Sequence, residues 1–377
     1  MGPLKGIRVI ELQGIGPGPF CGMMLADMGA DLIRIDRAAS AGRPAGKDIL
    51  ARGRQSIAVD LKHPDGVETV LRLIEGADVL IEGFRPGVME RLGLGPEVCM
   101  ARNDRLVYGR MTGWGQYGSM AHAAGHDINY ISLSGALHAI GEPGGKPVPP
   151  LNMVGDFGGG GMLLAFGITS ALVERATSGK GQVVDAAMTD GSALLMNGLF
   201  PGMQTGQWLP ERGKNMLDGG AHFYGSYETR DGKVISIGSI EPQFYALLLE
   251  KTGLADDPAL AKQMARAEWP ALKAKLTAVF KSKTRDEWDA IMLGTDICYA
   301  PILSFSEAVT HPHNRDRQTF VTVDGLTQAA PAPRFSRTAP EVPAAAAAPG
   351  QHSRSVLAAA GYSAAEIDAL IASGAVA

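Results

Sequence analysis

Ile7-Arg8-Val9-Ile10-Glu11-Leu12 is a run of strand-forming residues near the start of the chain, and with the stretches that follow it decides the expected fold. A helix is predicted over Gly18–Met28, and Ala30-Asp31-Leu32-Ile33-Arg34-Ile35-Asp36 is predicted as a second strand. The same alternation continues to about residue 112, with strands at Ser56–Leu61, Asp78–Glu82 and Arg105–Met111 and a helix from His63 towards Glu75. Because such alternation is typical of a parallel sheet covered by helices, we expect a Rossmann-like α/β domain.

The turn after the first strand raises the alternative of a dinucleotide-dependent oxidoreductase. Gly14-Ile15-Gly16 follows the strand, and Asp36 ends the second strand at a suitable distance. The third glycine of the GxGxxG fingerprint is replaced by Pro19, however, and Pro17 also lies in the turn. A proline lacks an N–H and adds bulk where close packing requires glycine, so this alternative is disfavoured.

Size and composition indicate an ordinary globular protein. The chain has 377 residues, 45% of them hydrophobic and 20% charged, which allows two domains or one large domain. The formal net charge of −4 gives no reason to expect binding to nucleic acid or to a membrane surface, so an anionic ligand would need a local cluster of basic residues. We also expect no membrane-spanning segment.

Cysteine usage and the two ends of the chain favour the cytoplasm. Three cysteines, Cys21, Cys99 and Cys298, are widely spaced, which supports neither a disulfide framework nor a cysteine-based metal site. The first predicted strand begins almost at once, leaving no room for a signal peptide, and Ala375-Val376-Ala377 is not a peroxisomal signal.

Two short motifs between Gly125 and Gly161 place ionisable side chains beside glycines. They are Gly125-His126-Asp127-Ile128-Asn129-Tyr130 and Gly155-Asp156-Phe157-Gly158-Gly159-Gly160-Gly161. Asp156 is predicted just before, or in, the first turn of a buried helix, where negative charge is favoured. Asp156 could be a simple N-cap and His126 a structural histidine. Four successive glycines weaken a helix, which suggests a backbone shaped for a ligand, and imidazole and carboxylate are natural proton carriers. The residues alone leave both interpretations open.

Basic residues recur where the predicted strands of the first half end. Arg37, Lys62, Arg85 and Arg91 lie at these positions. Ligands of doubly wound sheets bind outside the carboxyl ends of the strands, and arginine can bind phosphate bidentately, so a phosphorylated ligand is indicated. Scattered surface charge is the alternative for any single residue.

The second half of the chain predicts a smaller α+β domain. Phe223–Thr229 and Lys233–Gly238 form an expected hairpin joined at Asp231-Gly232. Helices are expected near Pro242–Thr252, Pro270–Lys281 and Thr284–Leu293, and over Ala364–Ser373 behind a Ser363–Glu366 capping box. The expected layout is a large domain over residues 1–185, a crossing segment over 186–222, a small domain over 223–318, and a return segment over 319–377 that completes the large domain.

The two glycine motifs, together with Gly238-Ser239-Ile240-Glu241-Pro242-Gln243-Phe244-Tyr245, resemble the racemase branch of the family III CoA transferases. The resemblance runs from about Leu4 to Gly361-Tyr362-Ser363-Ala364-Ala365-Glu366-Ile367. It implies a large discontinuous domain made by both chain ends, a smaller inserted domain, and a homodimer of interlocked subunits.

The resemblance also assigns roles to residues. His126 and Asp156 would be the catalytic acid–base pair, and Glu241 would bind the other imidazole nitrogen of His126. Backbone N–H groups near Asp156-Phe157-Gly158 are the expected donors to an enolate oxygen. The implied substrate- and CoA-binding residues are Arg37, Val59, Asp60, Leu61, Lys62, Gly83, Phe84, Arg85, Arg91, Gly125, Asp127, Ile128, Asn129, Tyr130 and Asn152. Among them, Asp127 and Tyr130 would shape the pocket and Asn152 would position Asp156.

The implied activity is the interconversion of (2R)- and (2S)-2-methylacyl-CoA thioesters through an enolate. The alternative is a family III CoA transferase in which Asp156 accepts the acyl group, although transferases do not place the His126 motif at this position. We expect no metal and no cofactor, since CoA is part of the substrate. The preferred acyl chain is left open.

Overall fold

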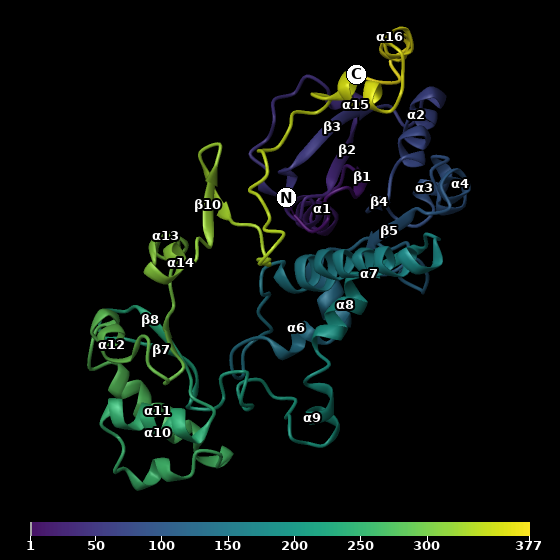
Figure 1. Cartoon of the computed structure of the whole chain (residues 1–377). Coiled ribbons are helices and arrows are strands. Elements are labelled where there is room, and N and C mark those ends of the chain that lie inside the picture. The colour runs from purple at the N-terminus through teal and green to yellow at the C-terminus, as the bar shows by residue number, and fades with distance from the viewer. Residues whose placement is uncertain (1) are drawn as a thin grey trace. The chain divides into compact units, whose positions relative to one another are not determined.

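The computed structural model describes residues 2–377, which divide into two compact units (Figure 1). Unit 1 contains residues 2–135, Leu151–Met196 and Gln318–Ala377, and unit 2 contains Ala136–Pro150 and Asn197–Arg317. The division differs from the expected one at residues 136–150 and throughout the expected crossing segment, whose residues 197–222 group with unit 2. Ala136–Pro150 groups with unit 2, and residues 186–196 belong to unit 1 because they complete its sheet and the helix that follows.

Unit 1 is built on a six-stranded sheet in which all neighbouring strands are parallel. Its strands are β1 (Arg8–Leu12), β2 (Asp31–Arg37), β3 (Arg54–Val59), β4 (Val79–Glu82), β5 (Val107–Thr112) and β6 (Val183–Ala187). Their order is β3-β2-β1-β4-β5-β6, which is the doubly wound Rossmann order and confirms the expected fold class. The order reverses between β1 and β4, and the carboxyl ends of these two strands are therefore the expected ligand-binding edge.

Helices cover both faces of this sheet (Figure 1). The helices of unit 1 are α1 (Pro17–Asp27), α2 (Pro64–Glu75), α3 (Val88–Arg91), α4 (Pro96–Arg102), α5 (Asp127–Leu133), α7 (Leu163–Ser178), α8 (Met188–Leu195), α15 (Ser353–Ala359) and α16 (Ala364–Ala372). Ile10 and Leu80 face a core made with α2, α4, α15 and α16, and Val9 and Ile81 face a second core made with α1 and α7. Successive side chains of each strand thus enter opposite cores, as expected for a sheet buried on both faces.

A π-helix, η3 (Met153–Met162), precedes α7 and continues into it. By length and hydropathy, Met153–Ser178 is the one stretch of residues 2–377 that could cross a membrane. In this structure it packs against α1, α8 and strand β5. One side of this stretch therefore belongs to the core of unit 1.

The return segment is tied to the sheet. After the hairpin β10 (Phe320–Val323) and β11 (Leu326–Ala329), the chain reaches α15 and α16, and α16 begins with the expected Ser363–Glu366 capping box. Val376 then pairs with Val59 at the end of β3.

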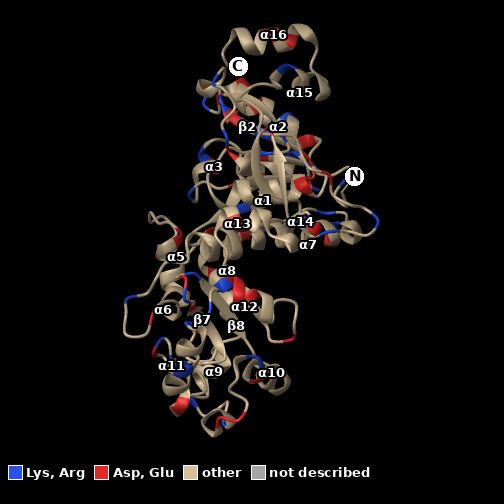
Figure 2. Ribbon diagram, turned by 90° about the vertical axis from the view of Figure 1, so that its left-hand side faces the viewer, with Lys and Arg blue, Asp and Glu red and all other residues tan. Residues whose placement is uncertain are grey.

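Unit 2 contains a three-stranded antiparallel sheet covered by helices. Its strands are β7 (Tyr224–Glu228), β8 (Val234–Gly238) and β9 (Tyr299–Pro301). Its helices are α6 (Ala136–Ala139), α9 (Phe200–Gln204), α10 (Pro242–Thr252), α11 (Trp269–Phe280), α12 (Arg285–Met292), α13 (Phe305–Thr310) and α14 (Pro312–Asp316). The aromatic residues Phe223, Tyr245, Trp269, Phe280 and Trp288 form much of its core. Acidic and basic residues are interspersed along both units (Figure 2).

Candidate active site

Asp156 lies at the carboxyl edge of the sheet, beside the turn that joins β1 to α1. Gly16 is the N-cap of α1 and has a φ of 68°, and a Cβ added to it would lie 3.2 Å from Oδ2 of Asp156. The same distance means that the Asp156 carboxylate is packed directly against this turn. Asp156 lies in the first turn of η3, as predicted.

The His126 motif reaches the same edge from β5. Tyr130, on α5, packs so closely on Gly113, directly after β5, that a Cβ on Gly113 would lie 2.0 Å from its ring. The Tyr130 hydroxyl donates to the Gly125 carbonyl. His126 itself is the exposed N-cap of α5, and its backbone N–H donates to Oδ1 of Asn129 at 3.0 Å.

Asp127 connects the two motifs. Its side chain is buried, and Oδ1 accepts a hydrogen bond from the backbone N–H of Asp156 at 2.7 Å. A Cβ on Gly155 would lie 2.4 Å from the same oxygen, so only glycine allows this approach. This hydrogen bond therefore connects the N-terminus of α5, which carries His126, to the first turn of η3, which carries Asp156.

The surroundings of Asp156 raise the pKa of its carboxyl. Burial is the largest cause, and the negative charge of Asp127 acts in the same direction. A hydrogen bond from Nδ2 of Asn152 to Oδ2 at 3.1 Å opposes the shift, as does the nearby His126. Asn152 thus contacts Asp156 as predicted, and His126 and Asp156 are close enough to interact electrostatically. A carboxyl group with a raised pKa is better matched to proton transfer near neutral pH.

Three of the glycines after Asp156 pack against neighbouring helices. A Cβ on Gly159 would lie 2.6 Å from the backbone nitrogen of Ser192 in α8, and one on Gly161 would lie 2.7 Å from the carbonyl oxygen of Pro17 in α1. Gly160 is in similar contact with both helices. These glycines let η3 approach α1 and α8 closely, and that approach holds Asp156 at the edge.

Two of the expected enolate donors near Asp156-Phe157-Gly158 already have hydrogen-bond partners within the protein. The Asp156 N–H donates to Asp127, and the Phe157 N–H donates to the Asn152 carbonyl at 3.3 Å, so neither is available. At the start of α5, by contrast, the N–H groups of Asp127 and Ile128 donate to no group among residues 2–377. Such first-turn N–H groups have no partner within their own helix, and these two follow His126 directly.

The predicted CoA-binding residues lie along the same edge. Arg37 and Val59 end β2 and β3, Asp60–Lys62 follow β3, Gly83–Arg85 follow β4, and Arg91 ends α3. Among residues 2–377, the side chains of Arg37, Lys62, Arg85 and Arg91 make no ion pair and no side-chain hydrogen bond, and all four are exposed. Several other arginines of unit 1, among them Arg102 and Arg110, are paired with carboxylates.

Several backbone groups assigned to CoA are already engaged. The Asp60 N–H donates to the Ala375 carbonyl at 2.9 Å, and the Phe84 N–H donates to Oε2 of Glu82 at 2.7 Å. CoA contacts from this backbone would therefore use other groups, such as the N–H of Leu61 or Gly83. The assignment of these residues to CoA stays a prediction.

Glu82 is a buried acidic residue at this edge that the sequence analysis did not single out. It ends β4 and is buried, and it accepts hydrogen bonds from Phe84 and from Nε of Arg110, the latter at 2.9 Å. Burial raises its pKa to about 7, against the opposing effects of Phe84 and Arg110. The sequence signal was an acidic residue that ends a fully apolar strand directly before Gly83-Phe84-Arg85.

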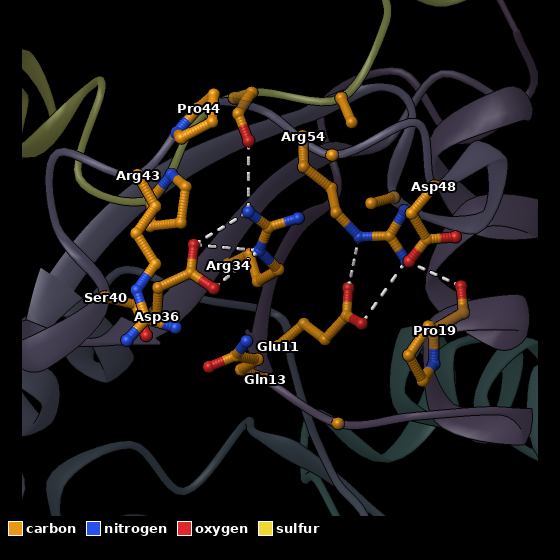
Figure 3. A pocket seen from close by; sticks show the side chains of 16 residues that line it. Glu11, Gln13, Pro19, Arg34, Asp36, Ser40, Arg43, Pro44, Asp48 and Arg54 are labelled. Carbon is orange, nitrogen blue, oxygen red and sulfur yellow. Dashed lines mark hydrogen bonds and ion pairs between the residues drawn. The ribbon is translucent and has the colours of Figure 1, made fainter.

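Beside the carboxyl ends of β1 and β2 lies a cavity of about 230 Å³ (Figure 3). Its charged walls are paired with each other: Arg34 binds Asp36 through Nη2 at 2.8 Å, and Arg54 binds Glu11 through Nε at 2.6 Å. Asp36 also accepts a hydrogen bond from Oγ of Ser56 at 2.5 Å. Its carboxylate is therefore occupied, which further disfavours a dinucleotide ribose at this position.

Glu241, the third predicted catalytic residue, lies in unit 2. It is the exposed N-cap of α10, and its carboxylate makes no hydrogen bond to the helix it caps. Its role beside His126 stays a prediction.

Comparison with known proteins gives the family. The sequence profile of CoA-transferase family III matches residues 4–353, and the chain belongs to this family. It is 50% identical to alpha-methylacyl-CoA racemase of Mus musculus over 368 residues, which cover 97% of this chain and 95% of the mouse protein. It is 46% identical to alpha-methylacyl-CoA racemase of Homo sapiens over 367 residues, with the same coverage of 97% and 95%.

More distant relatives share the fold. Succinyl-CoA–D-citramalate CoA-transferase of Chloroflexus aurantiacus is 32% identical over 378 residues, covering 94% of this chain and 93% of that protein. A CAIB/BAIF family protein from Brucella suis has a crystal structure that matches with a TM-score of 0.81 and 25% identity, covering 95% of this chain and 99% of that one. The resemblance stated from the three sequence motifs is thus confirmed.

Proposed function

We propose that this protein racemises 2-methylacyl-CoA thioesters by removing the proton at C2 and returning it to the opposite face. The observation that carries the proposal is the fastening of α5 to η3 through Asp127, which holds His126 and Asp156 together at the ligand-binding edge. The similarity to two alpha-methylacyl-CoA racemases at 50% and 46% identity supports it.

The chemistry follows from the properties of the two side chains. His126 removes the C2 proton from one epimer while protonated Asp156 supplies a proton on the other face, and the roles reverse in the other direction. The raised pKa of Asp156 suits a carboxyl group that must alternate between acid and base.

The enolate needs stabilisation of its oxygen as well as proton carriers. The N–H groups of Asp127 and Ile128, next to His126, are the proposed donors to the thioester oxygen. A single donor of this kind is commonly worth about 3 kcal/mol in the transition state. Glu241 is the proposed partner of the second imidazole nitrogen, where a carboxylate would fix the tautomer and favour the imidazolium.

The nucleotide part of CoA is proposed to bind along the carboxyl ends of β2, β3 and β4. Arg37, Lys62, Arg85 and Arg91 lack carboxylate partners among residues 2–377, so their charges are available to phosphates.

One experiment separates this function from the transferase alternative, which the 32% identical transferase keeps open. A single epimer of a 2-methylacyl-CoA is incubated with the protein in deuterated water, without an acceptor acid. We expect deuterium at C2 in both epimers. An unchanged thioester that transfers its CoA once a free carboxylic acid is added would establish the transferase instead, and hydroxylamine trapping of an acyl group on Asp156 would agree with it.

The proposed assembly is a homodimer of interlocked subunits. Met162, Phe166 and Val173 are 51%, 69% and 73% exposed and lie on one face of the helix that η3 and α7 form. Such a row of large apolar side chains is typical of an interface. Sedimentation equilibrium should give twice the chain mass, and Phe166→Glu should weaken the association.

The proposed location is the cytoplasm, and the proposed cofactor requirement is none beyond the CoA of the substrate. Among residues 2–377 no group of three or more His, Cys, Asp and Glu side chains is arranged to hold a metal ion. Activity should therefore survive dialysis against a chelator. The location is tested separately, by fractionation of the protein with cytoplasmic markers.

A further inference from the structure

The turn that carries Glu241 is fixed by its backbone rather than by the Glu241 side chain. Within unit 2 the Glu241 carboxylate makes no ion pair and no hydrogen bond, and the residue is exposed. Its carbonyl accepts a hydrogen bond from the Tyr245 N–H at 3.0 Å, which begins α10. The direction in which the carboxylate points therefore depends on how the preceding residues, Gly238–Ile240, are held.

The first part of this turn is anchored to the sheet of unit 2. The Gly238 N–H donates to the Cys298 carbonyl at 2.9 Å, and the Ser239 N–H donates to the Phe223 carbonyl at 2.9 Å. Oγ of Ser239, which is fully buried, donates to the Ile297 carbonyl at 2.5 Å. These bonds fix the N–H side of the turn.

The carbonyl side is held by one side chain. Nε2 of Gln263 donates to the Ser239 carbonyl at 3.0 Å and to the Ile240 carbonyl at 2.9 Å, so both hydrogens of this amide are used on the turn. Ile240 directly precedes Glu241. Gln263 lies between two short 3₁₀ helices, Pro258–Ala261 and Arg266–Glu268, far from the turn in sequence.

Gln263 is itself held in place by the core of unit 2. Its backbone carbonyl accepts a hydrogen bond from Nε1 of Trp269 at 2.9 Å. Trp269 is 5% exposed and packs against Phe223. A buried tryptophan thus fixes the backbone of Gln263, and the Gln263 amide in turn fixes the two carbonyls before Glu241.

We propose that Gln263 is a positioning residue for Glu241, acting through the Ser239 and Ile240 carbonyls. The inference rests on the proposed function, because Glu241 matters only if its carboxylate binds the imidazole of His126. Gln263 does not contact the substrate. It sets the geometry of the carboxylate that tunes the imidazole, and small displacements of such groups cost up to about 100-fold in rate.

The test compares Gln263 variants with a Glu241 variant. Gln263→Glu has the same shape but presents acceptor oxygens to two carbonyls, so the turn must move. Gln263→Asn keeps the amide but is one methylene too short to reach both carbonyls. Gln243→Glu is the control, since it adds the same charge to exposed α10 without touching the turn. Thermal unfolding of each variant identifies any that fail to fold, and Gln263→Asn is the conservative one.

Glu241→Gln should lower kcat and move the acidic limb of the kcat/KM profile to lower pH, because the imidazolium loses its counter-charge. Gln263→Glu and Gln263→Asn should lower kcat about 10-fold or more, move the limb in the same direction, and leave KM for acyl-CoA unchanged. Because the two residues act in series, the double variant Glu241→Gln/Gln263→Asn should be no worse than Glu241→Gln alone.

Three outcomes would overturn the inference. Wild-type kinetics in Glu241→Gln would remove the role of Glu241 from the proposed function, and the positioning role with it. An impaired Glu241→Gln beside folded Gln263 variants with a normal pH profile would remove the positioning role alone. Additive losses in the double variant, or an equal loss in Gln243→Glu, would show that Gln263 acts by another route.

Discussion

Asp156 and Glu241 are two carboxylates of the proposed site that the fold holds in opposite ways. Asp156 is partly buried in η3, hydrogen-bonded by Asn152, and gripped at its backbone by Asp127. Glu241 is exposed and has no side-chain partner within unit 2, and only its turn is fixed. Unit 1 therefore fixes the position of the Asp156 carboxyl and raises its pKa, whereas unit 2 fixes only the backbone of the Glu241 turn.

The largest effects should come from the acid–base pair in unit 1. His126→Ala and Asp156→Ala should each lower racemisation about 10³-fold, because each removes one of two proton carriers. If the two side chains face opposite sides of C2, each variant should retain slow hydrogen exchange for only one epimer, with retention of configuration. Exchange of C2 deuterium on each pure epimer, with CoA affinity as the control for folding, measures this.

The two exchange patterns also separate a two-sided site from a collapsed one. Equal residual exchange of both epimers in either variant, with CoA binding intact, would exclude the two-sided pair. Loss of exchange together with loss of CoA binding would indicate a collapse of the site.

The core beneath the Glu241 turn should be sensitive to acid. His222 is fully buried, and because the Tyr245 hydroxyl donates to the Leu260 carbonyl, His222 must donate to it through Nε2 at 2.7 Å. Nδ1 is then an unprotonated nitrogen without a partner among residues 2–377. Burial lowers the His222 pKa to about 4 from the ordinary 6.5.

The sign of the pH effect follows from that shift. Above pH 6.5 His222 is neutral in both the folded and unfolded states, and below it the unfolded state gains a proton first. Unit 2 should therefore lose stability as the pH falls from 6.5 to about 4, by about 3 kcal/mol in all. Denaturant unfolding of unit 2 across this range measures the loss, and His222→Gln should flatten it. An equally steep profile in His222→Gln would assign the effect to other groups.

The packing around Asp156 should tolerate little added volume. Gly159→Ala places a Cβ 2.6 Å from the backbone of α8, whereas Gly198→Ala meets nothing within 4 Å and is the matched control. We expect Gly159→Ala to lower the free energy of unfolding by about 1–3 kcal/mol and to lower kcat, because η3 carries Asp156. Equal melting temperatures for the two variants would show that η3 can shift without cost.

Replacing a basic residue at the carboxyl edge of the sheet should weaken substrate binding more than it slows the chemical step. Arg91→Ala should raise KM for acyl-CoA about 10-fold and leave kcat nearly unchanged, because a phosphate contact far from C2 stabilises ground and transition states alike. Arg102→Ala is the control, since Arg102 is already paired with Glu68 and Glu75. A loss confined to kcat would mean that Arg91 does not bind phosphate.

The sequence predicted the features that depend on residues close together in the chain, and it missed features that depend on distant contacts. The β-α-β alternation, the Asp231-Gly232 hairpin and the Ser363–Glu366 capping box are local signals, and the structure has all three. Strand β6 was missed because its sequence, Val-Val-Asp-Ala-Ala, has only two strand-forming residues and gains its pairing from β5, far away in the chain.

The sequence suggested candidate residues for the site but not the tertiary contacts that hold Asp156 in place. The glycines after Asp156 carry no local sign of whether a ligand or a helix will fill the space beside them, and the partners that decide it, α1 and α8, are not adjacent in sequence. The π-helical form of η3 and the grip of Asp127 on the Asp156 N–H depend on the same tertiary contacts. The motif therefore named the residues that Asp127 connects, and it gave no sign that the Asp156 N–H is already bonded to Asp127.

The smallest expected effect concerns how Asp127 supports Asp156. Asp127→Asn keeps an oxygen that can accept the Asp156 N–H but removes the charge that helps to raise the Asp156 pKa. A hydrogen bond to a neutral acceptor is weaker by about 1 kcal/mol than one to a charged acceptor, so kcat should fall about fivefold. In the direction in which Asp156 is the base, the acidic limb should move to lower pH, since its pKa is no longer raised by a neighbouring carboxylate. Asp127→Ala loses both the bond and the charge and should be much worse. An unchanged pH profile in Asp127→Asn would show that the charge of Asp127 does not affect Asp156. Asp127 would then act only by positioning Asp156 through the hydrogen bond, as Gln263 is proposed to position Glu241.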